Sequence, residues 1–201
     1  MPIRAVIFDI GGVLVQQSDR TAQRRWEKRL GLEDGLLGRE IWTMPISLQA
    51  EIGQASEDDA WVAVADRFEL TPIDLGALRG DFFSGSVWNV PLIDYARSLR
   101  ARCQTGIISN AWPNARADVQ RWVNGDAFDD LIFSAEVGLA KPDRRIYDLA
   151  LDRLLVQPAE AIFIDDVQGN VEAAQAIGMQ GIRFVNMEQT IADIERIFTQ
   201  G

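Results

Sequence analysis

Apolar and polar positions follow two different patterns along the chain, one typical of strands and one of helices. Mainly apolar runs, typical of strands buried on both faces of a sheet, lie at residues 3–8, 104–108, 131–133, 161–164 and 182–185. Apolar residues three or four positions apart, typical of amphipathic helices, lie at 91–99, 113–122, 142–154, 171–177 and 191–198. Pro142 is expected as the first helical residue of its segment. This alternation predicts an α/β fold with a parallel sheet and right-handed crossovers.

The stretch between the first strand and residue 88 follows the helical pattern alone. We expect helices at 21–30, 33–42, 56–68 and 72–83, and no strand-like run interrupts them. A helical block inserted after the first strand predicts a lid over the carboxyl edge of the sheet. Trp42 of this block, and Trp112 beyond it, are candidates to shape that cleft, although packing is the more common use of tryptophan.

Two of the apolar runs end on carboxylates. The first is followed by Asp9 and Ile10-Gly11-Gly12, and the run at 161–164 is followed by Asp165 and Asp166. Ligands of open α/β sheets bind just beyond the carboxyl ends of the strands. Three carboxylates at one such edge would repel one another unless a cation lay between them. The sequence therefore indicates a hard metal ion, bound by oxygen, beside a candidate aspartate nucleophile.

Further polar residues follow the other strands. Ser109 and Asn110 come after the run at 104–108, and Lys141 precedes the helix after the third strand. A phosphoryl group needs a nucleophile, charge neutralisation by Mg²⁺, and fixed donors for its equatorial oxygens. An aspartate, a hydroxyl, an amide and an ammonium group meet those needs. Gly11 and Gly12 let the backbone approach closely, with a carbonyl for the metal or an N–H for phosphate.

Each of these residues also has a simpler interpretation. Asp9 suits a turn, Asp165 or Asp166 a helix cap, and the Ser109-Asn110 pair the start of a loop. Lys141 suits an exposed surface, although a positive charge just before a helix opposes the helix dipole. The occurrence of all four in order, each after a successive strand, favours a site.

Composition limits the chemistry further. The chain has 201 residues, 47% of them hydrophobic, a net charge of −10, no histidine, and one cysteine, Cys103. The absence of histidine excludes Ser-His-Asp and Cys-His catalysis. The negative charge argues against a nucleic-acid or anionic-membrane partner. A single cysteine, no secretory cleavage pattern and no membrane-length apolar run lead us to expect a cytoplasmic protein.

Four segments in order resemble the motifs of the haloacid dehalogenase-like (HAD) superfamily, in the branch with a helical cap after the first strand. They are IFDIGGVL at 7–14, IISN at 107–110, GLAKP at 138–142 and FIDDVQGN at 163–170. The resemblance covers nearly the whole chain. It implies a Rossmann-like core at 1–15 and 88–201 and an all-helical cap at 16–87. Within the superfamily, the chain is most similar to sugar-phosphate phosphatases and to the N-terminal phosphatase domain of soluble epoxide hydrolases.

The resemblance implies roles for the matching residues. Asp9 would attack phosphorus and form an aspartyl-phosphate. The cofactor would be Mg²⁺, bound by Asp9, the Gly11 carbonyl and Asp166, while Asp165 would hold a metal-bound water. Ser109 and Asn110 would bind phosphate oxygens of a small phosphorylated substrate, and Lys141 would neutralise charge. Asn170 would orient Lys141 or the metal shell.

One position departs from the family pattern. Phosphatases of the superfamily usually carry a second aspartate, a general acid and base, where this chain has Gly11. General acid–base catalysis contributes about 100- to 10,000-fold. The departure keeps two alternatives open: a metal-independent 2-haloacid dehalogenase, and a non-catalytic module that binds phosphate and Mg²⁺. The sequence gives no indication of the oligomeric state.

Overall fold

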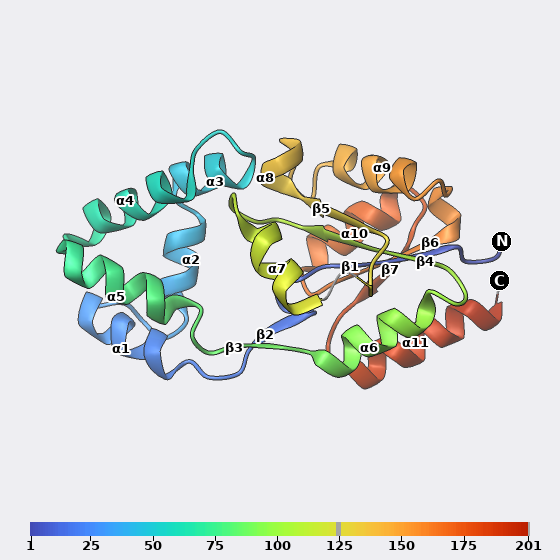
Figure 1. The fold of residues 1–201 in the computed structure, drawn as a ribbon, viewed down its shortest axis with the longest axis horizontal. Coiled ribbons are helices and arrows are strands. Elements are labelled where there is room, and N and C mark those ends of the chain that lie inside the picture. Colours follow the sequence, from blue (N-terminus) through green and yellow to red (C-terminus); the bar gives the residue numbers. More distant parts are fainter. Residues whose placement is uncertain (124–125, 201) are drawn as a thin grey trace.

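A five-stranded parallel sheet forms the centre of the larger part of the protein, as the apolar runs predict (Figure 1). The structure, a computed structural model, describes residues 1–123 and 126–200; positions 124–125 and 201 of the predicted core lie outside the described residues. The strand order is β5-β4-β1-β6-β7. The strands are β1 (Ala5–Phe8), β4 (Gln104–Ser109), β5 (Asp130–Phe133), β6 (Ala161–Asp165) and β7 (Gln180–Arg183).

Helices cover both faces of this sheet, which is why its strands are apolar throughout. Ile7 of β1 lies in the hydrophobic cluster formed with α9 (Arg144–Arg153) and α10 (Gln168–Ala176). Its neighbour Phe8 lies in the cluster formed with α6 (Val90–Leu99) and α11 (Met187–Gln200). Successive side chains of a strand point to opposite faces, so both faces are buried. The result is a three-layer α/β fold.

The register of the sheet places the chemical groups level with one another. Phe8 pairs with Ile107 of β4 and with Ile164 of β6. Asp9 and Asp165, the next residues, are therefore at the same height on the carboxyl edge, and Ser109 lies one residue further along β4. From β1 the chain continues to β4 and β5 on one side of the sheet, and then returns to β6 and β7 on the other side of β1. The carboxyl edge at β1 is therefore the topological switch point where open α/β sheets bind ligands.

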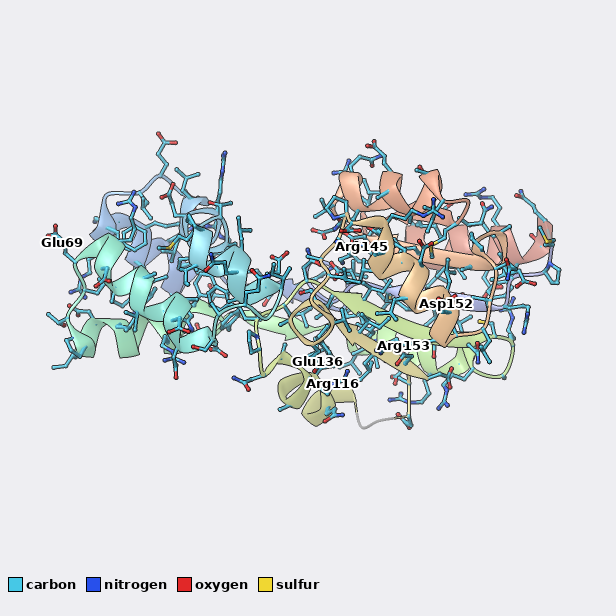
Figure 2. The ribbon with its side chains drawn as sticks, turned by 90° about the horizontal axis from the view of Figure 1, so that it is seen from above. Glu69, Arg116, Glu136, Arg145, Asp152 and Arg153 are labelled. Carbon is cyan, nitrogen blue, oxygen red and sulfur yellow. The ribbon has the colours of Figure 1, made fainter. Side chains whose placement is uncertain are left out.

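Five helices between β1 and β4 in the chain pack on one another as a separate helical unit (Figures 1 and 2). They are α1 (Thr21–Leu30), α2 (Leu36–Trp42), α3 (Pro45–Glu51), α4 (Glu57–Phe68) and α5 (Pro72–Phe82). Their own hydrophobic cluster includes Leu37, Trp61 and Leu78, and Trp112 of the sheet region also joins it. The unit lies beyond the carboxyl ends of the strands, away from the two termini (Figure 1).

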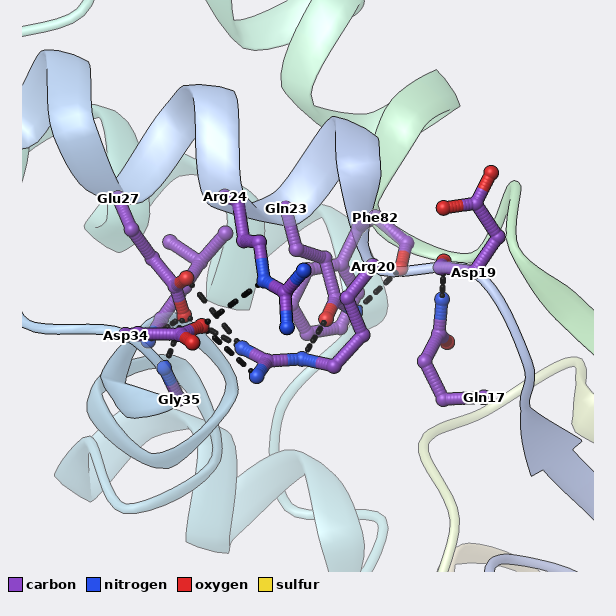
Figure 3. A network of polar contacts seen from close by, with 10 residues as sticks. Gln17, Asp19, Arg20, Gln23, Arg24, Glu27, Asp34, Gly35 and Phe82 are labelled. Carbon is purple, nitrogen blue, oxygen red and sulfur yellow. Dashed lines mark hydrogen bonds and ion pairs between the residues drawn. The ribbon is translucent and has the colours of Figure 1, made fainter.

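A buried carboxylate joins the first two helices of this unit (Figure 3). The Glu27 side chain, 2% exposed, accepts hydrogen bonds from the backbone N–H groups of Gly35 and Leu37 at the start of α2. Arg20 contributes a guanidinium that lies 3.0 Å from Glu27 Oε1 and 2.8 Å from Asp34 Oδ1. Glu27 therefore satisfies the donors at a helix start that has no side-chain cap of its own.

The expectation of helices alone at 16–87 is wrong at both ends of that range. Residues Val15–Gln17 (β2) and Ser86–Trp88 (β3) form an antiparallel two-stranded ribbon. Each strand has only three residues, too few for an alternating pattern to be recognised. The two segments that join the helical unit to the sheet region therefore lie side by side. The Asn89 N–H extends the ribbon by donating a hydrogen bond to the Leu14 carbonyl.

The other differences concern short elements and element ends. α9 begins at Arg144 rather than at Pro142, because Asp143 caps it and accepts a hydrogen bond from Arg145 N–H. Aspartate is a strong capping residue. β7 begins two residues before the predicted strand, because Ile182 pairs with Ile164 in the middle of its ladder.

Short helices without a full periodic stretch were missed by pattern reasoning. They are α3, α8 (Ser134–Val137) and the 3₁₀ turn Pro158–Glu160, whereas α7 (Ala115–Val123) was expected. Arg116 of α7 forms an ion pair with Glu136 of α8, 2.6 Å apart (Figure 2).

Among the described residues, no helix is both long and apolar enough to cross a membrane.

Candidate active site

Asp9 and Lys141 meet at the centre of the carboxyl edge. Asp9 follows β1, and its backbone N–H donates to the Ile164 carbonyl of β6. Lys141 reaches the same point from the loop before α9, and its Nζ lies 2.8 Å from Asp9 Oδ1. Both residues are buried, with 7% and 5% of their surface exposed. A surface role for Lys141 and a plain turn role for Asp9 are therefore inconsistent with the structure.

Asp165 completes a buried chain of charges behind them. Its Oδ2 lies 2.7 Å from Lys141 Nζ and accepts a hydrogen bond from Asn170 Nδ2. Its Oδ1 accepts a hydrogen bond from Val167 N–H. Lys141 Nζ also donates to the Ile108 carbonyl, so its three N–H groups each have a partner. The ammonium group is thereby fixed against one face of Asp9.

Asp166 lies beside Asp165 but faces Gly12. Gly12 has a positive φ of 75°, and a Cβ built there would overlap the Asp166 carboxylate. Glycine is therefore required at position 12 for both backbone conformation and space. The Gly12 N–H donates to the Val15 carbonyl. Gly11 differs, because a Cβ built there meets no atom within 4 Å.

The three carboxylates can share one cation. One oxygen each from Asp9, Asp165 and Asp166 lie within 4.8 Å of one another. With Lys141 as the only basic side chain paired to the group in the described parts of the chain, three negative charges face one positive charge. Carboxylate oxygens are the ligands that hard divalent ions prefer. The donor set therefore fits Mg²⁺.

The electrostatics of the free site agree with this arrangement. Burial raises the pKa of Asp9 from its ordinary value of 3.8 to about 6; Lys141 opposes this rise and the nearby Asp165 adds to it. Burial and Asp165 also raise the pKa of Asp166. Carboxylates that are hard to ionise together are held in the ionised form by a bound cation.

Ser109, the last residue of β4, and Asn110, which follows it, have different surroundings. Ser109 is 5% exposed and lines the cavity described below, and among the described residues its hydroxyl has no hydrogen-bond partner. Asn110 instead binds the Lys141 backbone: its Oδ1 accepts from Lys141 N–H, and its Nδ2 donates to the Lys141 carbonyl. Asn110 Nδ2 also donates to Glu51 Oε1 of α3, 2.9 Å away. The Asn110 side chain therefore positions Lys141 and joins it to the helical unit.

A cavity of about 830 Å³ opens from this edge toward the helical unit. Gly11, Gly12, Ser109 and Asn110 form one end of it. Trp42 and Trp112 both line it, with ring centroids 4.4 Å apart, so these two candidates face the cleft. A volume of this size is typical of small-molecule sites.

Glu51 is the residue of this region that sequence reasoning missed. It ends α3, a helix that was not predicted, and no motif includes it. Burial raises its pKa. The only sequence signal was Pro45, which occupies the first turn of that helix, a position that favours proline.

Comparison with known proteins agrees with the fold. The family profile of haloacid dehalogenase-like hydrolases matches residues 3–178. The chain is 29% identical to pig bifunctional epoxide hydrolase 2 over 98% of its own length, but spans only 39% of that protein. It is 27% identical to the sesquiterpene phosphatase astK of Aspergillus oryzae, with 96% of each chain covered. It is 26% identical to a D-ribitol-5-phosphate phosphatase of Bacteroides thetaiotaomicron, covering 89% of this chain and 90% of that protein.

Solved structures give the same fold. A predicted HAD-like hydrolase from Porphyromonas gingivalis superposes with a TM-score of 0.75 at 26% identity, covering 98% of both chains. A HAD enzyme of Bacteroides thetaiotaomicron, solved with magnesium and inorganic phosphate, superposes with a TM-score of 0.74 at 22% identity, covering 90% of this chain and 93% of that one. With the match over residues 3–178 and the four motif segments at one edge of the sheet, the chain belongs to the haloacid dehalogenase-like hydrolases.

Proposed function

We propose that this protein is a Mg²⁺-dependent phosphomonoesterase that hydrolyses a small phosphorylated metabolite through an aspartyl-phosphate on Asp9. The observation that carries the proposal is the buried contact between Lys141 Nζ and Asp9 Oδ1, 2.8 Å long, beside the carboxylates of Asp165 and Asp166. A binding module would have no need of an attacking carboxylate in this position. The similarity to a sesquiterpene phosphatase and to a D-ribitol-5-phosphate phosphatase supports the same reaction.

Asp9, Asp166 and the Gly11 carbonyl would hold Mg²⁺, with Asp165 acting from behind. When bound, Mg²⁺ neutralises charge on the carboxylates and on a phosphoryl group. Lys141 fixes the rotamer of Asp9 through its ion pair and also lowers the charge that an incoming phosphate meets. The Ser109 hydroxyl, which lines the cavity, would donate to an equatorial phosphate oxygen.

The reaction would proceed in two displacements. An Asp9 oxygen attacks phosphorus and the ester oxygen of the alcohol leaves. Water then attacks the phosphorus of the aspartyl-phosphate and frees the carboxylate. Because position 11 is glycine, the leaving group would take its proton from water, so substrates with good leaving groups should react fastest.

The helical unit would act as the cap of this site, with residues 16–87 over a core of 1–15 and 88–201. The cavity between the two parts supports this role, since it is lined by residues of both. The net charge of −10 supports a partner other than nucleic acid. A cytoplasmic location is supported by the single cysteine, half-buried Cys103.

The test compares the wild type with Asp9→Asn on 4-nitrophenyl phosphate, with Mg²⁺ and with EDTA. We expect the variant and the chelated enzyme to lose at least 1,000-fold in kcat/KM, as removal of a nucleophile does. Full activity of Asp9→Asn would end the nucleophile assignment. Halide release from 2-chloropropionate that persists in EDTA would show a dehalogenase instead, and turnover at the buffer rate on a broad phosphate panel would show a binding module.

A further inference from the structure

The walls of the cavity differ in chemistry from its phosphate end. Beyond the glycines and Ser109, the lining is largely aromatic and aliphatic; it includes Trp42, Phe82, Phe83, Val87, Val90 and Trp112. These residues come from α2, α5, β3, α6 and the loop after β4, so both parts of the molecule contribute. A surface assembled from five elements is a feature of the fold rather than of one exposed helix.

Three of these side chains are exposed to an unusual degree for apolar residues in a cavity. Phe83 is 49%, Val87 54% and Val90 53% exposed. Contiguous exposed apolar surface beside a polar site marks a place where a ligand is bound. Covering it removes apolar area from water, which is favourable in proportion to the area.

The polar residues of the walls are already engaged with the protein. Gln17 donates to the Asp19 carbonyl and accepts from the Ser86 hydroxyl. Gln23 donates to the Phe82 carbonyl. Glu57, the one charged residue among the described residues of the lining, accepts from Trp61 Nε1 and faces Arg79.

This lining is poorly suited to a sugar. A polyhydroxylated ligand needs several free donors and acceptors, because burying its hydroxyls without partners is costly. Within the described residues, no lysine or arginine lines the cavity, so a second phosphate or a carboxylate would have no cationic partner there. The walls therefore match a neutral, apolar group.

We propose that the substrate is the phosphate monoester of an apolar alcohol, whose hydrocarbon chain occupies the cavity while its phosphate lies at Asp9 and Ser109. This inference rests on the proposed phosphatase function and narrows its substrate class. In the net reaction, one water is consumed, the phosphorus–oxygen ester bond breaks, and the alcohol and inorganic phosphate leave. The released alcohol takes its proton from water.

The experiment measures kcat/KM for butyl, hexyl and octyl phosphate with Mg²⁺, below their micelle-forming concentrations, with D-ribitol 5-phosphate for comparison. Each buried methylene group is worth up to about fourfold. We expect kcat/KM to rise at least tenfold from butyl to octyl phosphate and to be lowest for the sugar-alcohol phosphate. A flat or falling series, with Asp9-dependent hydrolysis of 4-nitrophenyl phosphate intact, would overturn the inference and keep the proposed function.

Variants of the cavity wall test where the hydrocarbon chain of the substrate lies. Val87→Asn and Phe83→Gln should each reduce the octyl-to-butyl ratio at least threefold, because they make the wall polar without adding charge. Val62→Asn is the matched control: Val62 is 57% exposed on α4 and does not line the cavity, so its ratio should equal that of the wild type. Equal octyl-to-butyl ratios in all of these proteins would place the hydrocarbon chain of the substrate elsewhere and overturn the inference.

A binding measurement keeps the inference independent of turnover. Octyl- and butylphosphonate are not hydrolysed, and the tryptophans of the cavity report their binding through fluorescence. If no phosphate ester is hydrolysed, the proposed function fails, and the phosphonates alone decide whether the cavity binds the hydrocarbon chain of a phosphate-bearing ligand. Octylphosphonate binding at least tenfold tighter than butylphosphonate supports it, and equal affinities overturn it.

Discussion

The environment of Asp9 disfavours the ionised form of its carboxyl group. Burial raises its pKa to about 6, so in the metal-free protein the carboxylate ionises at a cost to folding. The stabilising contribution of the protonated group is complete below pH 3.8 and is lost as the pH rises through about 6. Above that pH, the lost free energy of unfolding reaches about 3 kcal/mol at most.

Asp9→Asn should therefore stabilise the metal-free protein at neutral pH. In EDTA at pH 7.5, we expect a free energy of unfolding higher than that of the wild type by about 1–3 kcal/mol, and a difference about half as large at pH 5. Urea unfolding measures it. Asp66→Asn, at an exposed position, serves as the control, and its free energy of unfolding should stay within about 0.5 kcal/mol of the wild type. A destabilised Asp9→Asn at pH 7.5 would contradict the electrostatic account.

The two glycines after Asp9 should respond to substitution in opposite ways. A side chain at position 11 meets open space, and its φ is not in the left-handed region, whereas one at position 12 would overlap Asp166. Gly11→Asp would supply the missing acid–base group, and we expect its kcat on an alkyl phosphate to rise about tenfold or more. Gly11→Asn, equal in shape but unable to transfer a proton, should show no gain.

Gly12→Ala is the counterpart of that experiment. Because the added methyl group displaces the Asp166 carboxylate, Mg²⁺ affinity measured by calorimetry should fall at least tenfold. A Gly12→Ala protein with wild-type affinity, or a Gly11→Asn protein as fast as Gly11→Asp, would contradict these assignments.

Individual residues of the site were the most predictable part of the protein. Asp9, Ser109, Lys141, Asp165 and Asp166 all lie at the predicted edge, because strand ends in a parallel sheet are visible as apolar runs that stop. Their partners were less visible. The Asn110 side chain binds a backbone segment 31 residues away, and sequence position alone gives no sign of such a contact.

Two elements meet through Asn110. It holds the loop of Lys141 from the end of β4 and touches Glu51 at the end of α3. A carboxylate in place of its amide would face Glu51 with like charge and would lose the donor to the Lys141 carbonyl. The position of Lys141 is thus linked to the helical unit.

Asn110→Asp should lower kcat/KM at least tenfold, and adding Glu51→Gln should restore at least threefold, because the amide relieves the repulsion. Asn110→Ala should also lower kcat/KM, because the contact with the Lys141 backbone is lost. Adding Glu51→Gln should not restore it, because alanine carries no charge that could repel Glu51. Steady-state kinetics of six proteins, the wild type, Glu51→Gln, the two Asn110 variants and the two combined variants, form two double-mutant cycles. Identical effects of Glu51→Gln in both backgrounds would show that the contact has no role in catalysis.

Helix α1 and the start of α2 depend on Glu27. The carboxylate serves two backbone N–H groups and the Arg20 guanidinium while itself buried. Glu27→Ala should lower the free energy of unfolding by about 2–4 kcal/mol, because those groups lose their partner. Urea unfolding checks it, with exposed Glu33→Ala as the control. A loss below 0.5 kcal/mol, on the order of a surface substitution, would show that the network is dispensable.

Long elements were predicted well and short ones poorly, for a physical reason. α1 has the predicted bounds because ten residues carry a full amphipathic pattern. β2 and β3 have three residues each, and α8 has four, so tertiary contacts rather than local pattern determine them. The error at Pro142 arose from assigning the helix start to proline when the next residue, Asp143, is the stronger cap.

At the level of the whole molecule, the α/β architecture was predictable because it depends on the order of strands and helices. The cavity was not, because its lining joins segments from residue 10 to residue 133 that meet only in the folded chain. The proposed substrate choice therefore depends on tertiary structure, whereas the proposed chemistry at Asp9 depends on local motifs.

The central claim is that Asp9 accepts a phosphoryl group beside Mg²⁺ held with Asp166. A crystal structure of the protein with Mg²⁺ and beryllium trifluoride, an analogue of an aspartyl-phosphate, tests it most directly. We expect beryllium joined to an Asp9 carboxylate oxygen, Mg²⁺ contacting Asp9 and Asp166, and Lys141 Nζ contacting a fluorine. Beryllium trifluoride bound away from Asp9, or Mg²⁺ bound without Asp166, would contradict the account.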